Sequence, residues 1–166
     1  MLYKKSEKGF ELATDVDLFN LIPKPTLLSL AEKHLFTDVL SGQDITNGSQ
    51  VALYLSTKLN LKSREVFGVI YLSNDHRIIH DEVLFKGTYS EVSFSTRDVI
   101  IGCLNRSAAS IIVYHNHVNS VSEPSRSDRA LTSRLADACN LMDVALLDHV
   151  ILGRNDWFSF ADNGLL

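Results

Sequence analysis

Apolar residues along this chain follow helical and strand spacing in turn, and the pattern changes character near residue 45. Before that point, Pro23 and Pro25 precede a stretch from Thr26 to Leu40 whose apolar residues lie near helical spacing. We therefore expect residues 1–45 to form an N-terminal helical arm or extension, and residues 46–166 to form the compact domain.

The compact domain begins with a predicted helix over Ser49–Leu59, where apolar residues recur four apart. The β-branched and aromatic run EVFGVIYL (65–72) predicts a strand, joined by the turn SNDH to a second strand over 77–85. SIIVY (110–114) predicts a short strand in the buried middle of a sheet. Further helices are expected over about 95–105 and 125–141, and further strands over about 144–152 and 157–160. Hairpins mixed with crossover helices predict an α/β fold, a mixed β-sheet flanked by helices.

Composition and charge narrow the possible surroundings of the protein. The net charge of -4 provides no general attraction to nucleic acid or to an anionic membrane. The first residues lack the apolar core of a signal peptide, and no apolar run approaches the roughly 18 residues of a membrane span. Cys103 and Cys139 form no C-x-x-C pair, which is typical of reduced thiols. We expect a cytoplasmic protein without a membrane partner, and the sequence leaves its oligomeric state open.

Candidate chemistry gathers in the stretch HNHVNSVSEPSRSD (115–128), directly after the central strand. His115 and His117 lie two residues apart at a strand end, so their side chains should point to the same face. A loop can bring Asp128 back to them. Two histidines and one aspartate are ligands that Zn²⁺ accepts, and three protein ligands leave a fourth position for water. The spacing therefore predicts a catalytic zinc site.

Ser125 and Asp128 also have a second interpretation. The pattern S-x-x-D is typical of a capping box at a helix N-terminus. The two interpretations are compatible, because a cap can fix the first helical turn that presents Asp128. Ser125 would then lie near the metal site, where its hydroxyl could donate to a developing oxyanion.

Hydrolysis also needs a carboxylate that is not a metal ligand, to take a proton from water and return it to the leaving amine. Glu65 opens a strand predicted to be central, where a charge is costly without a partner, and it is the first candidate. Glu82, in HDEVLF, is the second. Either residue could instead be a solvated glutamate at a strand edge, so the residue pattern leaves this choice open.

Taken together, Glu65, His115-x-His117, Ser125 and Asp128 resemble the JAMM (MPN-plus) metalloprotease motif. Longer stretches narrow the resemblance to the bacterial RadC-like JAB-domain proteins. In chain order they are REVFGVIYL (64–72), LFKGTYSEV (84–92), ASIIVYHNH (109–117), EPSRSDRALTSRL (123–135), LLDHVILG (146–153) and FSFADNGLL (158–166). They cover most of residues 47–166.

The resemblance implies a JAB/MPN fold similar to that of cytidine deaminases. It also implies zinc bound by His115, His117 and Asp128, with Glu65 as general acid/base and Ser125 stabilising the tetrahedral intermediate. The implied reaction is hydrolysis of a peptide or isopeptide bond in a peptide or protein substrate. A hypothesis of another class is a zinc-stabilised, non-catalytic binding module in DNA repair or a mobile-element system. That module would have nucleic acid as its partner, which the acidic charge balance does not support.

Several segments depart from related patterns. In RadC-like proteins, Pro-Ser-Gly usually follows the second histidine. Here the three residues are Val118-Asn119-Ser120, which predicts a looser loop with its metal ligands intact. Residues 1–45 show no helix-hairpin-helix pattern, so DNA binding through such a module is not predicted. The P-C-x-x-C of zinc deaminases and the H-E-x-x-H of other metalloproteases do not occur. Asp148-His149, on a predicted strand, could orient a metal ligand, or His149 could be an ordinary buried, hydrogen-bonded histidine.

Overall fold

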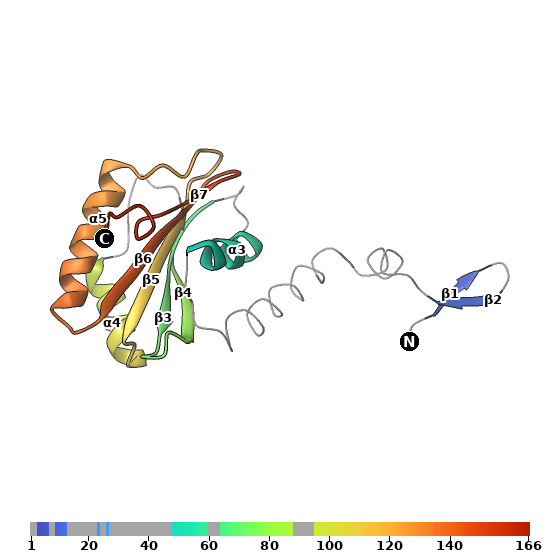
Figure 1. Ribbon diagram of the computed structural model, residues 1–166, viewed down its shortest axis with the longest axis horizontal. Helices are drawn as coiled ribbons and strands as arrows, with labels where there is room; N and C mark the ends of the chain where they lie inside the picture. Colours follow the sequence, from blue (N-terminus) through green and yellow to red (C-terminus); the bar gives the residue numbers. More distant parts are fainter. Residues whose placement is uncertain are drawn as a thin grey trace.

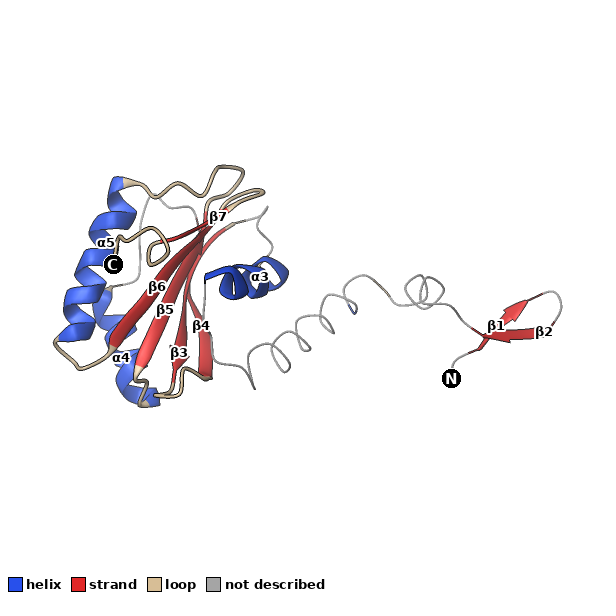
Figure 2. Ribbon diagram, in the orientation of Figure 1, coloured by secondary structure: helices blue, strands red, loops and turns tan. Residues whose placement is uncertain are grey.

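The computed structural model of the chain describes residues 3–6, 9–12, 23, 26, 48–59, 64–87 and 95–166. The body of the molecule is a five-stranded sheet of order β4-β3-β5-β6-β7 (Figures 1 and 2). Strands β1 (Tyr3–Ser6) and β2 (Gly9–Leu12) form a separate antiparallel hairpin. Most of the predicted N-terminal arm, including nearly all of its expected helix over 26–40, lies outside the described residues.

The sheet is mixed, as the sequence predicts. Strand β3 pairs antiparallel with β4 and with β5, β5 pairs parallel with β6, and β6 pairs antiparallel with β7. Their bounds are β3 Glu65–Leu72, β4 Ile78–Gly87, β5 Ser110–Asn116, β6 Ala145–Leu152 and β7 Trp157–Ser159. The central strand β5 is buried along its whole length, which confirms the prediction made from its continuous apolar run.

Two strand ends differ from the expectation. Strand β5 continues beyond Tyr114 to include His115 and Asn116, because both polar side chains find partners inside the fold. Strand β4 runs beyond its expected end at residue 85 and includes Lys86 and Gly87. Here Lys86 pairs with Val66 and Gly87 with Glu65, so the strand pairing with β3 continues to its first residue.

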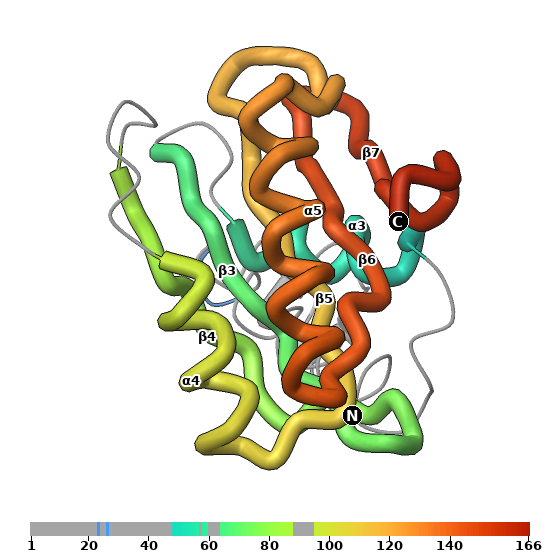
Figure 3. Tube along the Cα trace, turned by 90° about the vertical axis from the view of Figure 1, so that its left-hand side faces the viewer, coloured from blue at the N-terminus to red at the C-terminus, as the bar shows by residue number. Residues whose placement is uncertain are grey.

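Helices cover both faces of the sheet and create two separate cores. Helix α3 (Gly48–Lys58) packs on one face, and α4 (Thr96–Arg106) and α5 (Arg126–Asn140) lie across the other (Figure 3). Alternate residues of β3 and β5 enter the two cores: Ile70 and Ile112 lie on the α3 side, and Val69 and Val113 on the α4/α5 side. None of the helices in the described part of the chain has the length and apolarity that crossing a bilayer requires.

Candidate metal centre

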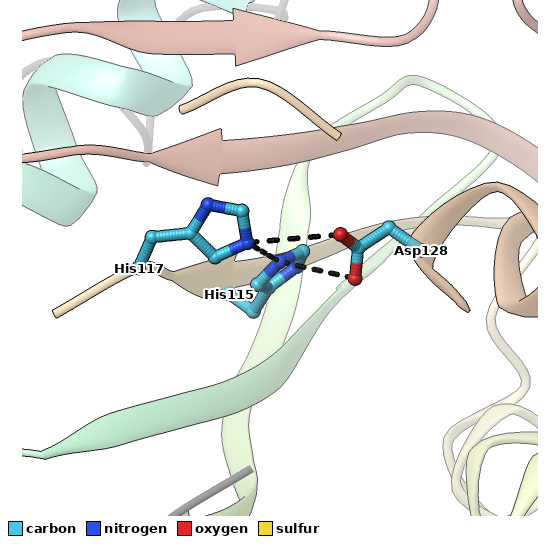
Figure 4. A group of neighbouring side chains, drawn as sticks. All are labelled: His115, His117 and Asp128. Atoms are coloured by element: carbon cyan, nitrogen blue, oxygen red, sulfur yellow. Dashed lines mark hydrogen bonds and ion pairs between the residues drawn. The ribbon is translucent and has the colours of Figure 1, made fainter. Parts of the chain in front are cut away.

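Three potential metal ligands meet where β5 ends and α5 begins (Figure 4). The Nε2 atoms of His115 and His117 lie 3.1 Å apart. His115 Nε2 is 3.4 Å from Asp128 Oδ1, and His117 Nε2 is 3.6 Å from Asp128 Oδ2. The alternation of side chains along a strand thus places both imidazoles on one face, as the sequence predicts.

These separations suit a tetrahedral metal ion. Zinc bonds of about 2.0–2.2 Å in tetrahedral geometry place the ligand atoms roughly 3.3–3.6 Å from one another. Two of the observed distances, 3.4 and 3.6 Å, fall in that range, and the third, 3.1 Å, lies just below it. Two imidazole nitrogens and one carboxylate are also a donor set that zinc accepts. The cluster could therefore hold a metal ion.

His117 is oriented by the loop that follows it. Its Nδ1 lies 2.8 Å from the carbonyl oxygen of Val121. A carbonyl oxygen only accepts hydrogen bonds, so Nδ1 carries a proton, and in the neutral ring Nε2 keeps its lone pair. That lone pair points toward His115 and Asp128 (Figure 4). The side chain of His117 is 18% exposed, so the cluster reaches solvent on this side.

The loop after His117 is tied to the turn between β6 and β7. Its residues 117, 120 and 122 form hydrogen bonds with Leu152, Arg154 and Asp156, respectively. A side chain at Gly153 would place its Cβ 2.7 Å from the amide nitrogen of Ser122, so only glycine allows this approach. Asn119 adopts a left-handed conformation with φ 57°, which asparagine tolerates better than most residues. These contacts offset the loosening expected from the missing Pro-Ser-Gly.

Ser125 is the N-cap of α5, and its capping box fixes the carboxylate of Asp128. The Ser125 backbone N–H and Oγ–H donate to Asp128 Oδ2 at 2.7 and 2.5 Å, and the Asp128 N–H donates back to Ser125 Oγ. Asp128 is fully buried, whereas Ser125 is exposed. The cap interpretation is confirmed, and the cap presents Oδ1 of Asp128 to His115.

Glu65 lies beside the cluster at the start of β3. The pairing of Phe67 with His115 places Glu65 on the same face, two residues along β3 toward His117. Its Oε2 atom is buried and has no hydrogen-bond partner among the described residues, and its charge contributes to raising the pKa of His117. Glu82, by contrast, forms an ion pair with Arg106 at 2.8 Å, midway along β4. Of the two candidate bases, the structure brings Glu65 to the metal ligands.

Asn116, the central residue of His-Asn-His, fixes the backbone on both sides of Glu65. Its side chain lies on the opposite face of β5, where Nδ2 donates to the Arg64 carbonyl at 3.0 Å and Oδ1 accepts from the Val66 N–H at 2.7 Å. Sequence reasoning missed this role. Its only signal is a polar residue between two ligands, and the partners lie 50 and 52 residues earlier.

His149 and Asp148 have different roles. His149 is fully buried on β6 and contacts His115, with its Nε2 2.8 Å from His115 Nδ1. Asp148, by contrast, forms its described hydrogen bonds with other groups. It accepts hydrogen bonds from the His149 N–H, the Ser159 hydroxyl and the Ala161 N–H, and so anchors the C-terminal segment. His149 is thus a buried, hydrogen-bonded histidine that contacts His115, which fits both interpretations, and Asp148 supports the C-terminal segment.

The electrostatic surroundings of the imidazoles differ. Burial lowers the pKa of His115 to about 4 and that of His149 well below its ordinary value. The pKa of His117 is raised, chiefly by its hydrogen-bonding contact with Asp128. His115 and His149 are therefore neutral at pH 7, the form in which imidazole binds a metal.

The sequence profile of the RadC-like JAB domain matches residues 45–165. The chain belongs to the RadC-like JAB domain family. A UPF0758 protein of Vibrio campbellii is 37% identical over 163 residues, which cover 98% of this chain and 73% of that protein. A UPF0758 protein of Haemophilus influenzae is 36% identical over 165 residues, covering 99% of this chain and 75% of the relative.

A third relative, a UPF0758 protein of Vibrio cholerae, is 39% identical over 138 residues, covering 83% of this chain and 62% of that protein. Family membership confirms the resemblance that the sequence motifs indicate. The mixed five-stranded sheet between helices is the architecture of a JAB/MPN domain. Within this RadC-like domain, the His-His-Asp cluster is like the zinc site of the JAMM motif.

Proposed function

We propose that this RadC-like JAB domain is a zinc-dependent hydrolase that cleaves a peptide or isopeptide bond in a peptide or protein substrate. One observation carries the proposal: the metal-ligand cluster and the unbonded, buried oxygen of Glu65 lie together at one end of one sheet face. Three protein ligands with a solvent-facing side are typical of catalytic zinc sites, whereas structural sites have four protein ligands.

His115, His117 and Asp128 would hold the ion through two imidazole Nε2 atoms and a carboxylate oxygen. When bound, zinc supplies a Lewis acid that polarises a carbonyl and makes a water molecule easier to deprotonate. The capping box at Ser125 and the Val121 carbonyl fix two of these ligands before the ion binds. This preorganisation limits the reorganisation that binding requires.

Glu65 would act as general base and then as general acid. Its carboxylate takes one proton from the attacking water, whose hydroxyl adds to the scissile carbonyl carbon. Glu65 then gives that proton to the leaving nitrogen as the C–N bond breaks. Its unbonded Oε2 atom supports this role, because no described hydrogen bond must break before it accepts the proton.

Ser125 would stabilise the tetrahedral intermediate through its exposed hydroxyl. In the structure this hydroxyl donates to Asp128 Oδ2 at 2.5 Å, and it also contacts the Ser127 hydroxyl at 2.7 Å. Rotation about its side chain would redirect the O–H to the developing oxyanion, while the backbone N–H of Ser125 keeps its bond to Asp128.

The test compares wild type with Glu65→Gln, using mixtures of peptides and of isopeptide-linked proteins analysed by mass spectrometry. Gln keeps the shape of the side chain but cannot act as the base. We expect the variant to retain zinc and to lose turnover by about 10²–10⁴-fold. Unchanged turnover would contradict the role of Glu65. Zinc binding by wild type without any cleavage would instead favour the zinc-stabilised binding module, and salt-sensitive binding to duplex DNA would support that alternative.

A further inference from the structure

A line of hydrogen bonds runs from His115 into the interior, away from the metal centre. His149 Nε2 lies 2.8 Å from His115 Nδ1, and His149 Nδ1 lies 2.6 Å from the Thr132 hydroxyl. Thr132 Oγ1 is in turn 2.7 Å from the carbonyl oxygen of Asp128, one helical turn earlier in α5. The line therefore begins at one metal ligand and ends at the main chain of another.

The direction of each hydrogen bond follows from the carbonyl at its end. A carbonyl oxygen only accepts, so the single hydroxyl proton of Thr132 points to Asp128. The hydroxyl must then accept at its other contact, so His149 carries its proton on Nδ1. A neutral imidazole has one N–H, and His149 Nε2 is therefore an acceptor.

The tautomer of His149 in turn determines that of His115. Because His149 Nε2 accepts, His115 Nδ1 must carry the proton in their shared hydrogen bond. The Nε2 atom of His115 is then left with a lone pair, directed at His117 and Asp128. Phe160 stacks on the His149 ring at 4.9 Å, and this apolar packing favours the neutral form that the argument needs.

We propose that Thr132 and His149 are positioning residues that fix His115 in the tautomer able to bind a metal through Nε2. The proposal rests on the metal centre of the proposed function and assigns it a support that reaches from α5 through β6 to β5. Metal-binding histidines commonly donate their second N–H to a carboxylate or a carbonyl. Here the acceptor is a second histidine, His149. It can accept on Nε2 only if its proton is on Nδ1, and the hydrogen bond to Thr132 keeps the proton there.

Thr132→Val and Thr132→Ser form the matched pair that tests this. Valine has nearly the shape of threonine but cannot accept the His149 Nδ1–H, so His149 can adopt the other tautomer and drive His115 to carry its proton on Nε2. Serine keeps the hydroxyl. We expect Zn²⁺ affinity, measured by competition with a chromophoric chelator, to fall about 10–100-fold in Thr132→Val and to change by less than about threefold in Thr132→Ser. Equal affinities of the two variants would overturn the proposal.

A second measurement reads the tautomers directly. Long-range ¹H–¹⁵N spectra of the metal-free, full-length wild-type protein at pH 7 should show His115 and His149 protonated on Nδ1. Thr132→Val should shift both rings toward protonation on Nε2, a signature that a merely structural role would not produce. Protonation of His115 on Nε2 in the wild type would overturn the inference. If the wild type binds no zinc, the proposed function fails, and these metal-free spectra still decide the tautomer assignment by the same two outcomes.

Discussion

Two carboxylates are buried on opposite faces of the same sheet, and their surroundings differ. On the α3 face, Asp81 accepts hydrogen bonds from Tyr54 at 2.6 Å and Tyr114 at 2.8 Å, and forms an ion pair with Lys58. On the α5 face, Asp128 lies opposite the Nε2 lone pairs of His115 and His117. Asp81 is surrounded by donors and a positive charge, whereas Asp128 accepts hydrogen bonds from Ser125 at Oδ2 and also faces two imidazole nitrogens.

This difference distinguishes a structural cluster from a candidate metal centre. Proteins usually satisfy buried polar groups internally, and the Asp81 cluster does so. Facing lone pairs repel, and the added carboxylate of Glu65 increases the negative potential around them. Such an arrangement destabilises the metal-free protein, and a bound cation turns the repulsion into attraction. The contrast predicts that damage to the two clusters should affect different properties.

The largest expected effect is the loss of zinc affinity when one histidine is removed from the metal centre. His117→Ala deletes a ligand whose ring is partly exposed, so the metal-free fold loses little. We expect Zn²⁺ affinity to fall by at least about 1,000-fold, equivalent to about 4 kcal/mol, with the free energy of unfolding of the metal-free protein nearly unchanged. Chelator competition and urea unfolding measure the two quantities. A large loss of stability in the metal-free protein would show that His117 also contributes to the packing of the fold.

Removing Asp81 from the other cluster should lower the stability of the fold and leave zinc affinity nearly unchanged. Asp81→Ala removes the ion pair with Lys58 and the hydrogen bonds from the hydroxyls of Tyr54 and Tyr114. We expect the free energy of unfolding to fall by about 2–4 kcal/mol, with Zn²⁺ affinity within about threefold of wild type. Urea unfolding in the presence of a chelator gives the first value. Loss of zinc binding in this variant would mean that the two faces are coupled.

Acid should weaken the metal centre through its histidines. The pKa of His117 is raised by Asp128, so once the pH falls below that pKa, a proton competes with zinc and affinity should fall about tenfold per pH unit. The pKa of His115 is lowered to about 4, so the unfolded chain binds a proton there before the folded chain does. Its contribution to metal-free stability is therefore complete above about pH 6.5 and is lost as the pH falls toward 4.

Zinc titrations and urea unfolding from pH 7.5 to 4 would measure both effects. The Asp81 cluster contains no histidine, so Asp81→Ala should lose stability over the same pH range as wild type. Zinc affinity that does not change with pH would contradict histidine ligation.

Asn116 holds the backbone on both sides of Glu65, and its removal should have the smallest effect. Asn116→Ala removes two hydrogen bonds around Glu65 but leaves the metal ligands in place. We expect the free energy of unfolding to fall by about 1–2 kcal/mol and, under the proposed function, turnover to fall more than zinc affinity. Stability, affinity and turnover measured on one preparation test this order. Equal losses of affinity and turnover would argue against a specific role in placing Glu65.

Much of the fold and the ligand set could be predicted because their signals are local. The strand run before His115, the two-residue spacing to His117 and the cap at Ser125 each lie within one segment. The choice between Glu65 and Glu82 depended on the register of β3 against β5, which no local pattern contains.

The supporting residues were hidden for the same reason. Thr132 and Asn116 are ordinary residues in the sequence, and each acquires its role from partners 17 to 52 residues away. The apolar run before His115 also suggested a strand ending at Tyr114, because His115 and Asn116 look like loop residues until their buried partners are known.

The central claim is that the acceptor-rich cluster of His115, His117 and Asp128 binds zinc while the donor-rich cluster around Asp81 does not. The most direct measurement is elemental analysis of zinc per chain after reconstitution and gel filtration, on wild type, His117→Ala and Asp81→Ala. The account predicts about one zinc per chain in wild type and Asp81→Ala, and almost none in His117→Ala. No zinc in wild type, or equal zinc in all three proteins, would contradict it.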